Sequence, residues 1–257
     1  MNVNFRDHLY LWCHDPGVYN AIDGLHDQSF MTPVEAADYM GIKNIIMVSY
    51  DGKPVPPFDP IQKDFVKFKN VVWSIIGDSA CRYDNDEACV DEVISLRRTY
   101  PNVTGGIMDD FFQEGRSRFD LDAISRKMRQ AELPLWVVVY DFQIEREDVL
   151  RKLQDCDVIT FWTWDVKNIA CMEKNLMDLR DIFPKKRIAA GCYLWNFGGK
   201  LPLSVHHMEY QCNAAKALLC DGTIDDIIIL GSPLIGMNLS TIDWTRDWIE
   251  RQTFVRH

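Results

Sequence analysis

Residues 135–141, LWVVVYD, decide the fold because they form an unbroken apolar and aromatic run that ends in a carboxylate. Valine and aromatic residues favour β-strands, and a strand that is apolar on both faces is typical of a parallel sheet covered by helices. Five other runs have the same form and come at roughly even intervals: Leu9–Asp15, Ile45–Asp51, Val71–Asp78, Gly105–Asp110 and Val158–Asp165.

Two further apolar runs, Ile188–Asn196 and Ile227–Ser232, end in polar residues instead of an acid. Helix-like segments separate all eight runs, and this alternation predicts a single (β/α)8 barrel over residues 1–257. An open doubly wound sheet is the rival, but no G-x-G-x-x-G turn follows the first run. The expected strands are His8–His14, Asn44–Tyr50, Val71–Ile76, Val103–Met108, Leu135–Tyr140, Val158–Thr163, Arg187–Leu194 and Asp226–Leu230.

The helices between these strands carry recognisable end signals. Thr32, Pro33 and Glu35 predict a helix that begins with a capping box, and Gly41 predicts its end. Asp120 and Ser204 are the expected caps of two later helices. The remaining helices are expected over 61–68, from about 85, over 146–153, over 166–182 and over 241–252.

Length and charge narrow the class of protein. The 257 residues are close to the ~250 of one barrel domain, and no linker or low-complexity stretch divides them. The longest apolar runs are too short to span a bilayer, so we expect no membrane association. The formal charge of −10, without a basic patch, argues against nucleic acid as a partner and favours a neutral or cationic small ligand. Nothing in the sequence indicates an oligomeric state.

The sequence also indicates the cellular compartment of the protein. The segment MNVNFRDHLYLWCHD lacks the basic, apolar and small-residue regions of a signal peptide, although a chain processed by signal removal would look the same. The eight cysteines form no C-x-x-C pair and fall in apolar runs or on helix faces, which indicates reduced thiols. We therefore expect a cytoplasmic protein.

Carboxylates at the ends of the expected strands are the candidate catalytic groups. Asp109 and Asp110 close the segment TGGIMDDFF, and adjacent strand residues point to opposite sides, so one of them should face the barrel mouth. Asp165 lies beside Trp162 and Trp164, whose rings would raise the pKa of its carboxyl group as a general acid requires. A structural alternative remains for each: the pair could cap a helix or bind Arg116 or Arg118, and Asp165 could cap the helix that follows.

Aromatic and polar residues gather at the same strand ends. An aromatic ring suits the C–H face of a sugar, although ordinary packing would also use such rings. The aromatic residues concerned are Trp12, Tyr50, Phe111, Phe112, Tyr140, Trp162, Trp164, Tyr193 and Trp195. The residues expected to bind substrate are Trp12, His14, Asp15, Tyr50, Tyr140, Asp141, Trp164, Trp195 and Asn196, and Glu114 is a spare acid.

No cofactor or metal ion is expected. The first strand has no H-x-H pair and no strand ends in glutamate, which disfavours the metal centres that barrels often carry. A divalent cation held by the ring of aspartates stays open as an alternative.

The segment GGIMDDFF resembles the fourth-strand segment of (β/α)8 glycoside-hydrolase-like proteins, in which an apolar strand ends in an Asp-Asp-aromatic sequence. The resemblance implies a hydrolase of glycosides or oligosaccharides, with Asp109 or Asp110 as nucleophile or base and Asp165 as general acid. The chain departs from the glutamate-based members, because Asn196 stands where the seventh strand would end in glutamate, and it lacks the full D-x-x-D-x-D-x-E run of chitinase-like barrels.

Two other functions fit the same sequence. The loops NFGGK, with Lys200, and GSPLIG follow the seventh and eighth strands, where barrels often bind phosphate, so a phosphosugar lyase or isomerase is one alternative. A sugar-binding barrel without catalytic activity is the other.

Overall fold

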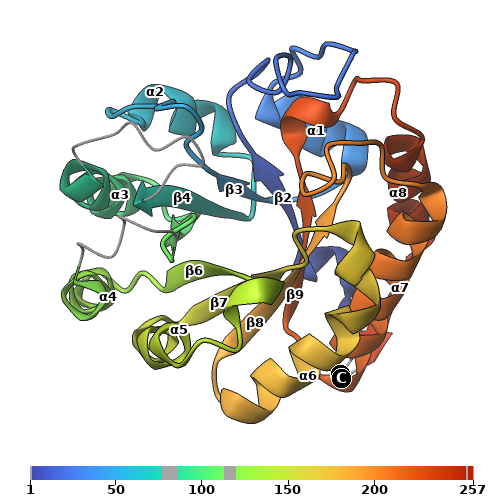
Figure 1. The fold of residues 1–257 in the computed structure, drawn as a ribbon. Helices are drawn as coiled ribbons and strands as arrows, with labels where there is room; N and C mark the ends of the chain where they lie inside the picture. Colours follow the sequence, from blue (N-terminus) through green and yellow to red (C-terminus); the bar gives the residue numbers. More distant parts are fainter. Residues whose placement is uncertain (1, 77–85, 113–119, 253, 257) are drawn as a thin grey trace.

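The computed structural model describes residues 2–76, 86–112, 120–252 and 254–256, and its centre is a closed barrel of eight parallel strands (Figure 1). Each strand pairs with the next along the chain, and β9 pairs with β2 to close the ring. The (β/α)8 fold predicted from the sequence is therefore confirmed. The barrel strands are β2 (Leu9–Cys13), β3 (Asn44–Met47), β4 (Asn70–Ile76), β5 (Val103–Met108), β6 (Leu135–Tyr140), β7 (Val158–Trp162), β8 (Arg187–Tyr193) and β9 (Asp226–Leu230).

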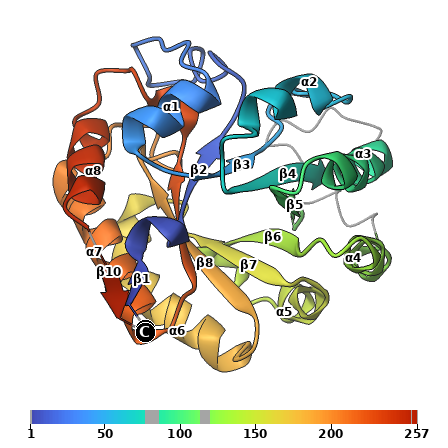
Figure 2. The same cartoon turned by 180° about the vertical axis from the view of Figure 1, so that it is seen from behind.

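Helices surround the barrel on its outside (Figures 1 and 2). At the start of the first one, the Thr32 side chain accepts a hydrogen bond from the Glu35 amide at 3.2 Å, and the Glu35 carboxylate accepts one from the Thr32 amide at 2.9 Å. This is the expected capping box, and Gly41, with a φ of 66°, ends the helix as expected. The helices are α1 (Pro33–Met40), α2 (Asp59–Gln62), α3 (Asp86–Thr99), α4 (Leu121–Gln130), α5 (Glu147–Lys152), α6 (Met172–Ile182), α7 (Val205–Asp221) and α8 (Ser240–Glu250).

Several expected elements differ from the structure. The helix expected over 61–68 is α2, which begins at Asp59, followed by a 3-10 helix, η2 (Lys63–Phe65). The second strand ends at Met47 rather than Tyr50, because Tyr50 turns back and exchanges two backbone hydrogen bonds with Lys53. The long helix expected over 166–182 is divided into a 3-10 helix, η5 (Val166–Cys171), and α6. None of these differences changes the order of the barrel strands.

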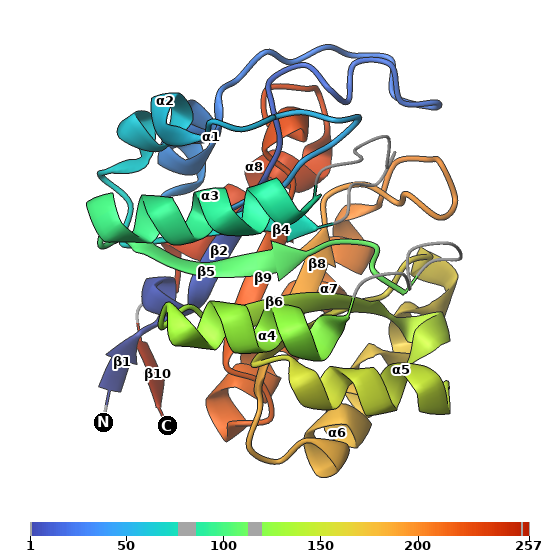
Figure 3. The ribbon, with the colours of Figure 1, turned by 90° about the vertical axis from the view of Figure 1, so that its left-hand side faces the viewer.

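One further sheet was not predicted from the sequence. Residues near the two chain ends form an antiparallel pair, β1 (Asn2–Asn4) with β10 (Phe254–Arg256). Figure 3 shows this pair beside the amino-terminal ends of the barrel strands, away from their arrowheads. The carboxyl-terminal mouth of the barrel is therefore on the opposite side from both termini. Among the described helices, none is long and apolar enough to cross a membrane.

Large side chains fill the barrel interior in layers. Tyr10 on β2 contacts Trp136 on β6 with ring centroids 5.3 Å apart, and Trp12 on β2 contacts Trp162 on β7 at 5.2 Å. These strands are not neighbours in the barrel, so both contacts cross its interior. The next inward positions along β2, two residues apart, continue to His14 at the mouth. Side chains of the upper interior layers thus form the floor of the mouth.

Gly191 on β8 makes room for the ring of Trp162. A Cβ atom at Gly191 would lie 2.0 Å from an atom of that ring. Because no side chain fits there, the indole lies flat across β8, directly below the mouth.

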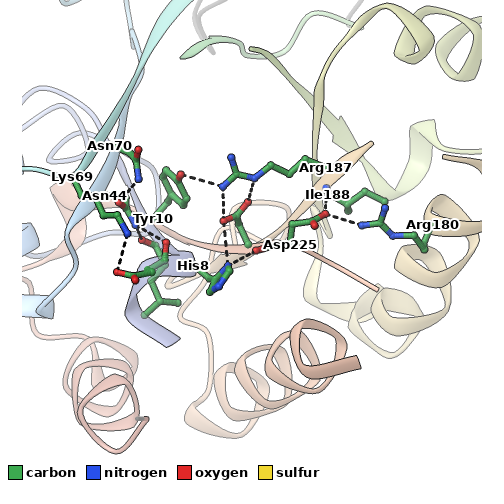
Figure 4. Close-up of polar contacts among 12 residues, drawn as sticks. His8, Tyr10, Asn44, Lys69, Asn70, Arg180, Arg187, Ile188 and Asp225 are labelled. Atoms are coloured by element: carbon green, nitrogen blue, oxygen red, sulfur yellow. Dashed lines mark hydrogen bonds and ion pairs between the residues drawn. The ribbon is translucent and has the colours of Figure 1, made fainter. Parts of the chain in front are cut away.

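A polar network closes the other end of the barrel (Figure 4). Arg187 donates two hydrogen bonds to the buried carboxylate of Asp226, at 2.6 and 2.8 Å, and a third to the Tyr10 hydroxyl at 3.3 Å. The Asp225 carboxylate accepts bonds from Arg180 and from the Ile188 amide. Burial raises the pKa of Asp226, and the Arg187 charge opposes that shift. The network therefore stabilises the amino-terminal end of the barrel, which lies opposite the mouth.

Candidate active site

The barrel mouth contains a cavity of about 220 Å³. It lies at the carboxyl ends of the strands, where (β/α)8 enzymes carry their chemistry. Its floor and walls come from β2, β6, β7, β8 and β9 and from the loops that follow β2, β3, β5, β7 and β8. The lining residues are Trp12, His14, Tyr19, Ile22, Tyr50, Asp109, Val138, Tyr140, Trp162, Trp164, Tyr193, Phe197 and Leu230.

Aromatic rings make up most of the cavity wall, and neighbouring rings meet at steep angles. Tyr19 contacts Tyr50 at an interplanar angle of 79° and Phe197 at 64°. Trp164 contacts Tyr140 at 77° and Tyr193 at 84°. The rings therefore form one continuous wall, and a bound group would meet aromatic surfaces from several directions.

His14 is fixed in the floor of the cavity with a defined tautomer. Its Nδ1 lies 2.8 Å from the carbonyl oxygen of Val48, so this nitrogen carries the proton and donates. Its Nε2 accepts a hydrogen bond from the Trp12 indole N–H at 3.0 Å. Both ring nitrogens are thus engaged with the protein, and His14 orients the Trp12 ring.

The two adjacent aspartates lie together beside the cavity. Asp109 lines it and is 3% exposed, and its amide donates to the Ile76 carbonyl at 3.1 Å. Asp110 adopts a φ of 51°, outside the extended conformation of the strand, so the rule that neighbours point to opposite sides does not apply to it. Its carboxylate accepts a hydrogen bond from the Tyr140 hydroxyl at 2.8 Å. The Asp109 charge also raises the pKa of Tyr140, so both carboxylates act on the same tyrosine.

Three buried tyrosines respond to this pair of charges. Burial raises the pKa values of Tyr19, Tyr140 and Tyr193 well above their usual range, and the nearby Asp109 and Asp110 charges raise them further. These phenols stay protonated at neutral pH, so each hydroxyl is a hydrogen-bond donor, and that of Tyr140 donates to Asp110.

The structure contradicts the surroundings expected for Asp165. Its carboxylate accepts a hydrogen bond from the Lys167 amide at 3.1 Å and forms an ion pair with the Lys167 ammonium at 2.9 Å. These contacts hold the pKa of Asp165 below its usual range, whereas a general acid needs a raised pKa. Asp165 is the N-cap of η5 and is absent from the cavity lining, so the helix-cap alternative describes it correctly.

Asp15 and Asp141 stand at strand ends without lining the cavity. Burial raises the pKa of Asp15, and Lys53 opposes that shift. The Asp141 carboxylate accepts hydrogen bonds from the Trp164 amide at 3.2 Å and from the Asn168 side chain at 2.8 Å. Asp141 therefore holds the start of the loop that carries Trp164, and its charge also contributes to the raised pKa of Tyr193.

Trp195 and Asn196 also lie outside the main cavity. The Asn196 side-chain oxygen accepts bonds from the Val166 and Gly199 amides, both at 3.2 Å, and so ties the β8–α7 loop to η5. Trp195 is buried beside Thr163 around a separate void of about 10 Å³. The expectation that these two residues line the same cavity as Trp12 is thus wrong, because the chain leaves the strand direction after Tyr193.

Of the residues expected at the site, the structure brings six together around the cavity, namely Trp12, His14, Tyr50, Asp109, Tyr140 and Trp164. Trp162 and Tyr193, noted for their place at strand ends, join them. Asp51 lies beyond β3 and is exposed, with a φ of 49°. Asp78, Glu114, Arg116 and Arg118 lie outside the described residues.

Sequence reasoning missed the part of the wall that comes from loops. Tyr19 and Ile22 follow β2, and Phe197 follows β8, and none of them stands at the end of a strand. The two loops meet where Tyr19 contacts Phe197 and where Lys200 lies 3.3 Å from Asp23. An apolar or aromatic residue in a loop is the one signal that could have indicated them.

The charges in the cavity disfavour a phosphorylated substrate there, as a phosphosugar lyase or isomerase would have. Within the described part of the wall, no lysine or arginine lines the cavity, and Lys200 is paired with Asp23 at the surface. A buried carboxylate such as Asp109 repels a phosphate group. Among the residues that the structure describes, no cluster of three or more acidic, histidine or cysteine side chains has the arrangement of a metal site.

Comparison with known proteins shows the fold. No protein-family model and no curated sequence matches the chain. Among solved structures, it is similar to the active domain 2 of a chitinase from Pyrococcus furiosus, with 14% identity, 94% and 93% of the two chains covered and a TM-score of 0.60. An endo-alpha-mannosidase from Bacteroides thetaiotaomicron gives 8% identity, 91% and 85% coverage and a TM-score of 0.56.

A tryptophan synthase alpha-subunit from Pyrococcus furiosus is also similar, with 12% identity, 97% and 98% coverage and a TM-score of 0.51. Two of these three neighbours are glycoside hydrolases and one is not. Similarity at this level of identity establishes the barrel and leaves the activity to be argued from the site.

Proposed function

We propose that the protein is a glycoside hydrolase whose reaction takes place in the aromatic cavity at the barrel mouth. The observation that carries the proposal is the buried carboxylate of Asp109 in a wall of aromatic rings, with Asp110 next to it. Hydrolysis of a glycosidic bond requires one carboxyl group to protonate the leaving oxygen and another to act at the anomeric carbon, directly or through water. Asp109 and Asp110 supply two carboxyl groups in one place.

Each nearby side chain has a part in this proposal. Tyr140 holds the Asp110 carboxylate through its hydroxyl, at 2.8 Å, and fixes its orientation. Tyr19 and Tyr193 remain protonated and offer donors to sugar hydroxyl groups. The proposal gives Asp165 no catalytic part, because Lys167 and the start of η5 occupy its carboxylate.

The rim of the cavity suits the rest of a sugar chain. Trp164 is 39% exposed, and Phe142 is 60% exposed and stacks on Tyr140 with an interplanar angle of 5°. Exposed rings at the edge of a buried aromatic site are suited to stacking against the C–H faces of further sugar units. One ring of the substrate would enter the cavity, and its neighbours would lie across Trp164 and Phe142.

A panel of 4-nitrophenyl glycosides, with unmodified oligosaccharides, tests the proposal. We expect hydrolysis of at least one member, and we expect Asp109→Asn to lower kcat by about 10²–10⁴ because a positioned acid or base is lost. The thermal midpoint should stay nearly unchanged, since asparagine keeps the shape of the side chain. Asp165→Asn is the matched control, and it should retain the rate within a few-fold.

Three outcomes would count against the proposal. A panel without any hydrolysis but with measurable sugar binding would identify a sugar-binding barrel. Full turnover by Asp109→Asn would remove the reaction from this cavity. A large rate loss in Asp165→Asn with an intact Asp109→Asn would return the chemistry to the end of β7.

A further inference from the structure

The cavity wall has the composition and geometry of a cage for a positive charge. Tyr19, Tyr50, Tyr193 and Phe197 line it together with Trp164. Most contacts between these rings are edge-to-face or tilted, and Trp164 stacks on Phe197 at an interplanar angle of 27°. The face of an aromatic ring carries partial negative charge, so rings on several sides of one cavity stabilise an enclosed cation.

Formal negative charge lies in the same wall. The Asp109 carboxylate lines the cavity, and the Asp110 carboxylate accepts a hydrogen bond from Tyr140, which also lines it. Both carboxylates shift the pKa values of Tyr19 and Tyr193 upward, which places their charges within electrostatic reach of the aromatic wall. Of the described lining residues, the one nitrogen base is His14, whose Nε2 already accepts a hydrogen bond from Trp12.

The size of the cavity limits what enters it. Its volume of about 220 Å³ is below the ~300–1,000 Å³ of pockets that enclose a whole drug-sized ligand. One small group, such as a trimethylammonium group or a single amino-substituted ring, matches this space. The chain's net charge of −10 also attracts cations toward the protein as a whole.

We propose that the natural ligand of this cavity carries a positively charged ammonium group, which the aromatic cage and the Asp109 carboxylate bind. The inference rests on the proposed function only in taking the cavity as the ligand site, and it concerns binding rather than hydrolysis. The ammonium group belongs either to an amino sugar or to a quaternary amine, and both share the chemistry that the cage recognises.

Two matched pairs of ligands test the inference by equilibrium titration. Choline is compared with 3,3-dimethylbutan-1-ol, which has the same shape without the charge, and glucosamine is compared with glucose at pH 6. Trp12, Trp162 and Trp164 line the cavity, so intrinsic fluorescence reports occupancy directly. We expect the charged member of at least one pair to bind about five-fold tighter or more, the effect of a desolvated cation–π contact. The pair that shows the difference identifies the source of the ammonium group.

Variants test whether the preference for the charged ligand comes from the cavity wall. Asp109→Asn should reduce the preference for the charged ligand, and Tyr19→Leu should reduce it by removing one cage wall, which keeps the test valid if either variant fails to fold. Trp244→Phe, on α8 and stacked on Trp248 away from the cavity, is the control and should leave both affinities unchanged.

Equal affinity for the charged and neutral members of both pairs would overturn the inference, and so would the absence of binding by all four ligands. Neither result depends on the hydrolysis panel. A protein that hydrolyses neutral glycosides but shows no charge preference would keep the proposed function and lose this inference.

Discussion

At the scale of single residues, Asp109 and Asp165 show that the residues next to an acid in sequence do not predict its surroundings in the fold. Asp165 follows Trp164 directly, yet alternation turns the tryptophan toward the cavity and the aspartate away from it, where Lys167 reaches back to pair with it. Asp109 has no charged or tryptophan neighbour in sequence apart from Asp110, and it is the one carboxylate in the described lining. The sequence predicted that acids at strand ends are candidate catalytic groups. Which way each side chain points depends on where its strand ends.

Gly191 is the residue whose replacement should most directly disturb the cavity floor. Alanine there would place its Cβ 2.0 Å from the Trp162 ring, which also packs on Trp12 with ring centroids 5.2 Å apart. We expect Gly191→Ala to lower the free energy of unfolding by about 3 kcal/mol, the upper part of the range for overpacked cores. Urea unfolding measures this change.

Gly231→Ala is the matched control for that variant. Its added Cβ would lie 3.4 Å from Tyr19, an ordinary contact, and the backbone is extended there, with a φ of −170°. This variant should be as stable as the wild type. Equal stability of Gly191→Ala and the wild type would mean that Trp162 does not lie against β8.

At the scale of secondary-structure elements, the strands were predictable and the loops were not. The bounds of β5, β6 and β9 match the expectation residue for residue, because each is an apolar run bounded by turn-forming or polar residues. Tyr19 and Phe197 belong to loops, whose path depends on contacts between distant segments. A periodic pattern encodes burial within one element, but it carries no information about which two loops meet.

The start of η5 should lose stability when its cap is removed. Asp165→Ala deletes a side chain that accepts a bond from the Lys167 amide, and such caps contribute about 1 kcal/mol. The pKa of Asp165 is lowered in the folded protein, so its stabilising effect is present at neutral pH and disappears as the pH falls through that lowered value.

The difference in unfolding free energy between the wild type and Asp165→Ala should therefore shrink between pH 7 and about pH 3. Chemical denaturation at a series of pH values measures it. A difference that grows toward low pH would contradict the ionised cap, and loss of hydrolysis without loss of stability would contradict the non-catalytic role of Asp165.

The base of the barrel should depend on the ion pair between β8 and β9. Arg187→Met leaves the fully buried Asp226 carboxylate without its two short hydrogen bonds. We expect a loss of about 3 kcal/mol, the lower part of the range for breaking a buried pair, because the Arg187 side chain is partly exposed. The double variant Arg187→Met with Asp226→Leu should recover much of this loss, and a double variant less stable than the single one would contradict the account.

At the scale of the whole molecule, the repeat of eight apolar runs was sufficient to predict the barrel. In this fold every strand is buried on both faces and all strands run parallel, so each leaves the same local signature. The pairing of β1 with β10 was not predictable, because three-residue strands at the two chain ends have no periodicity of their own. The cavity is an intermediate case. Six of its residues lie at strand ends or shortly after them and were expected, whereas Tyr19, Ile22 and Phe197 lie farther along the loops and were not.

A crystal structure of the Asp109→Asn variant, soaked with an oligosaccharide that the hydrolysis panel identifies, is the measurement that tests the central claim most directly. The account predicts one sugar ring inside the aromatic cavity, with its anomeric carbon about 3–3.5 Å from the side chain at position 109 or separated from it by one water. It also predicts that the next ring lies on Trp164. A sugar bound near Asp165 and Lys167, or at the loops after β8 and β9 with the cavity empty, would contradict it.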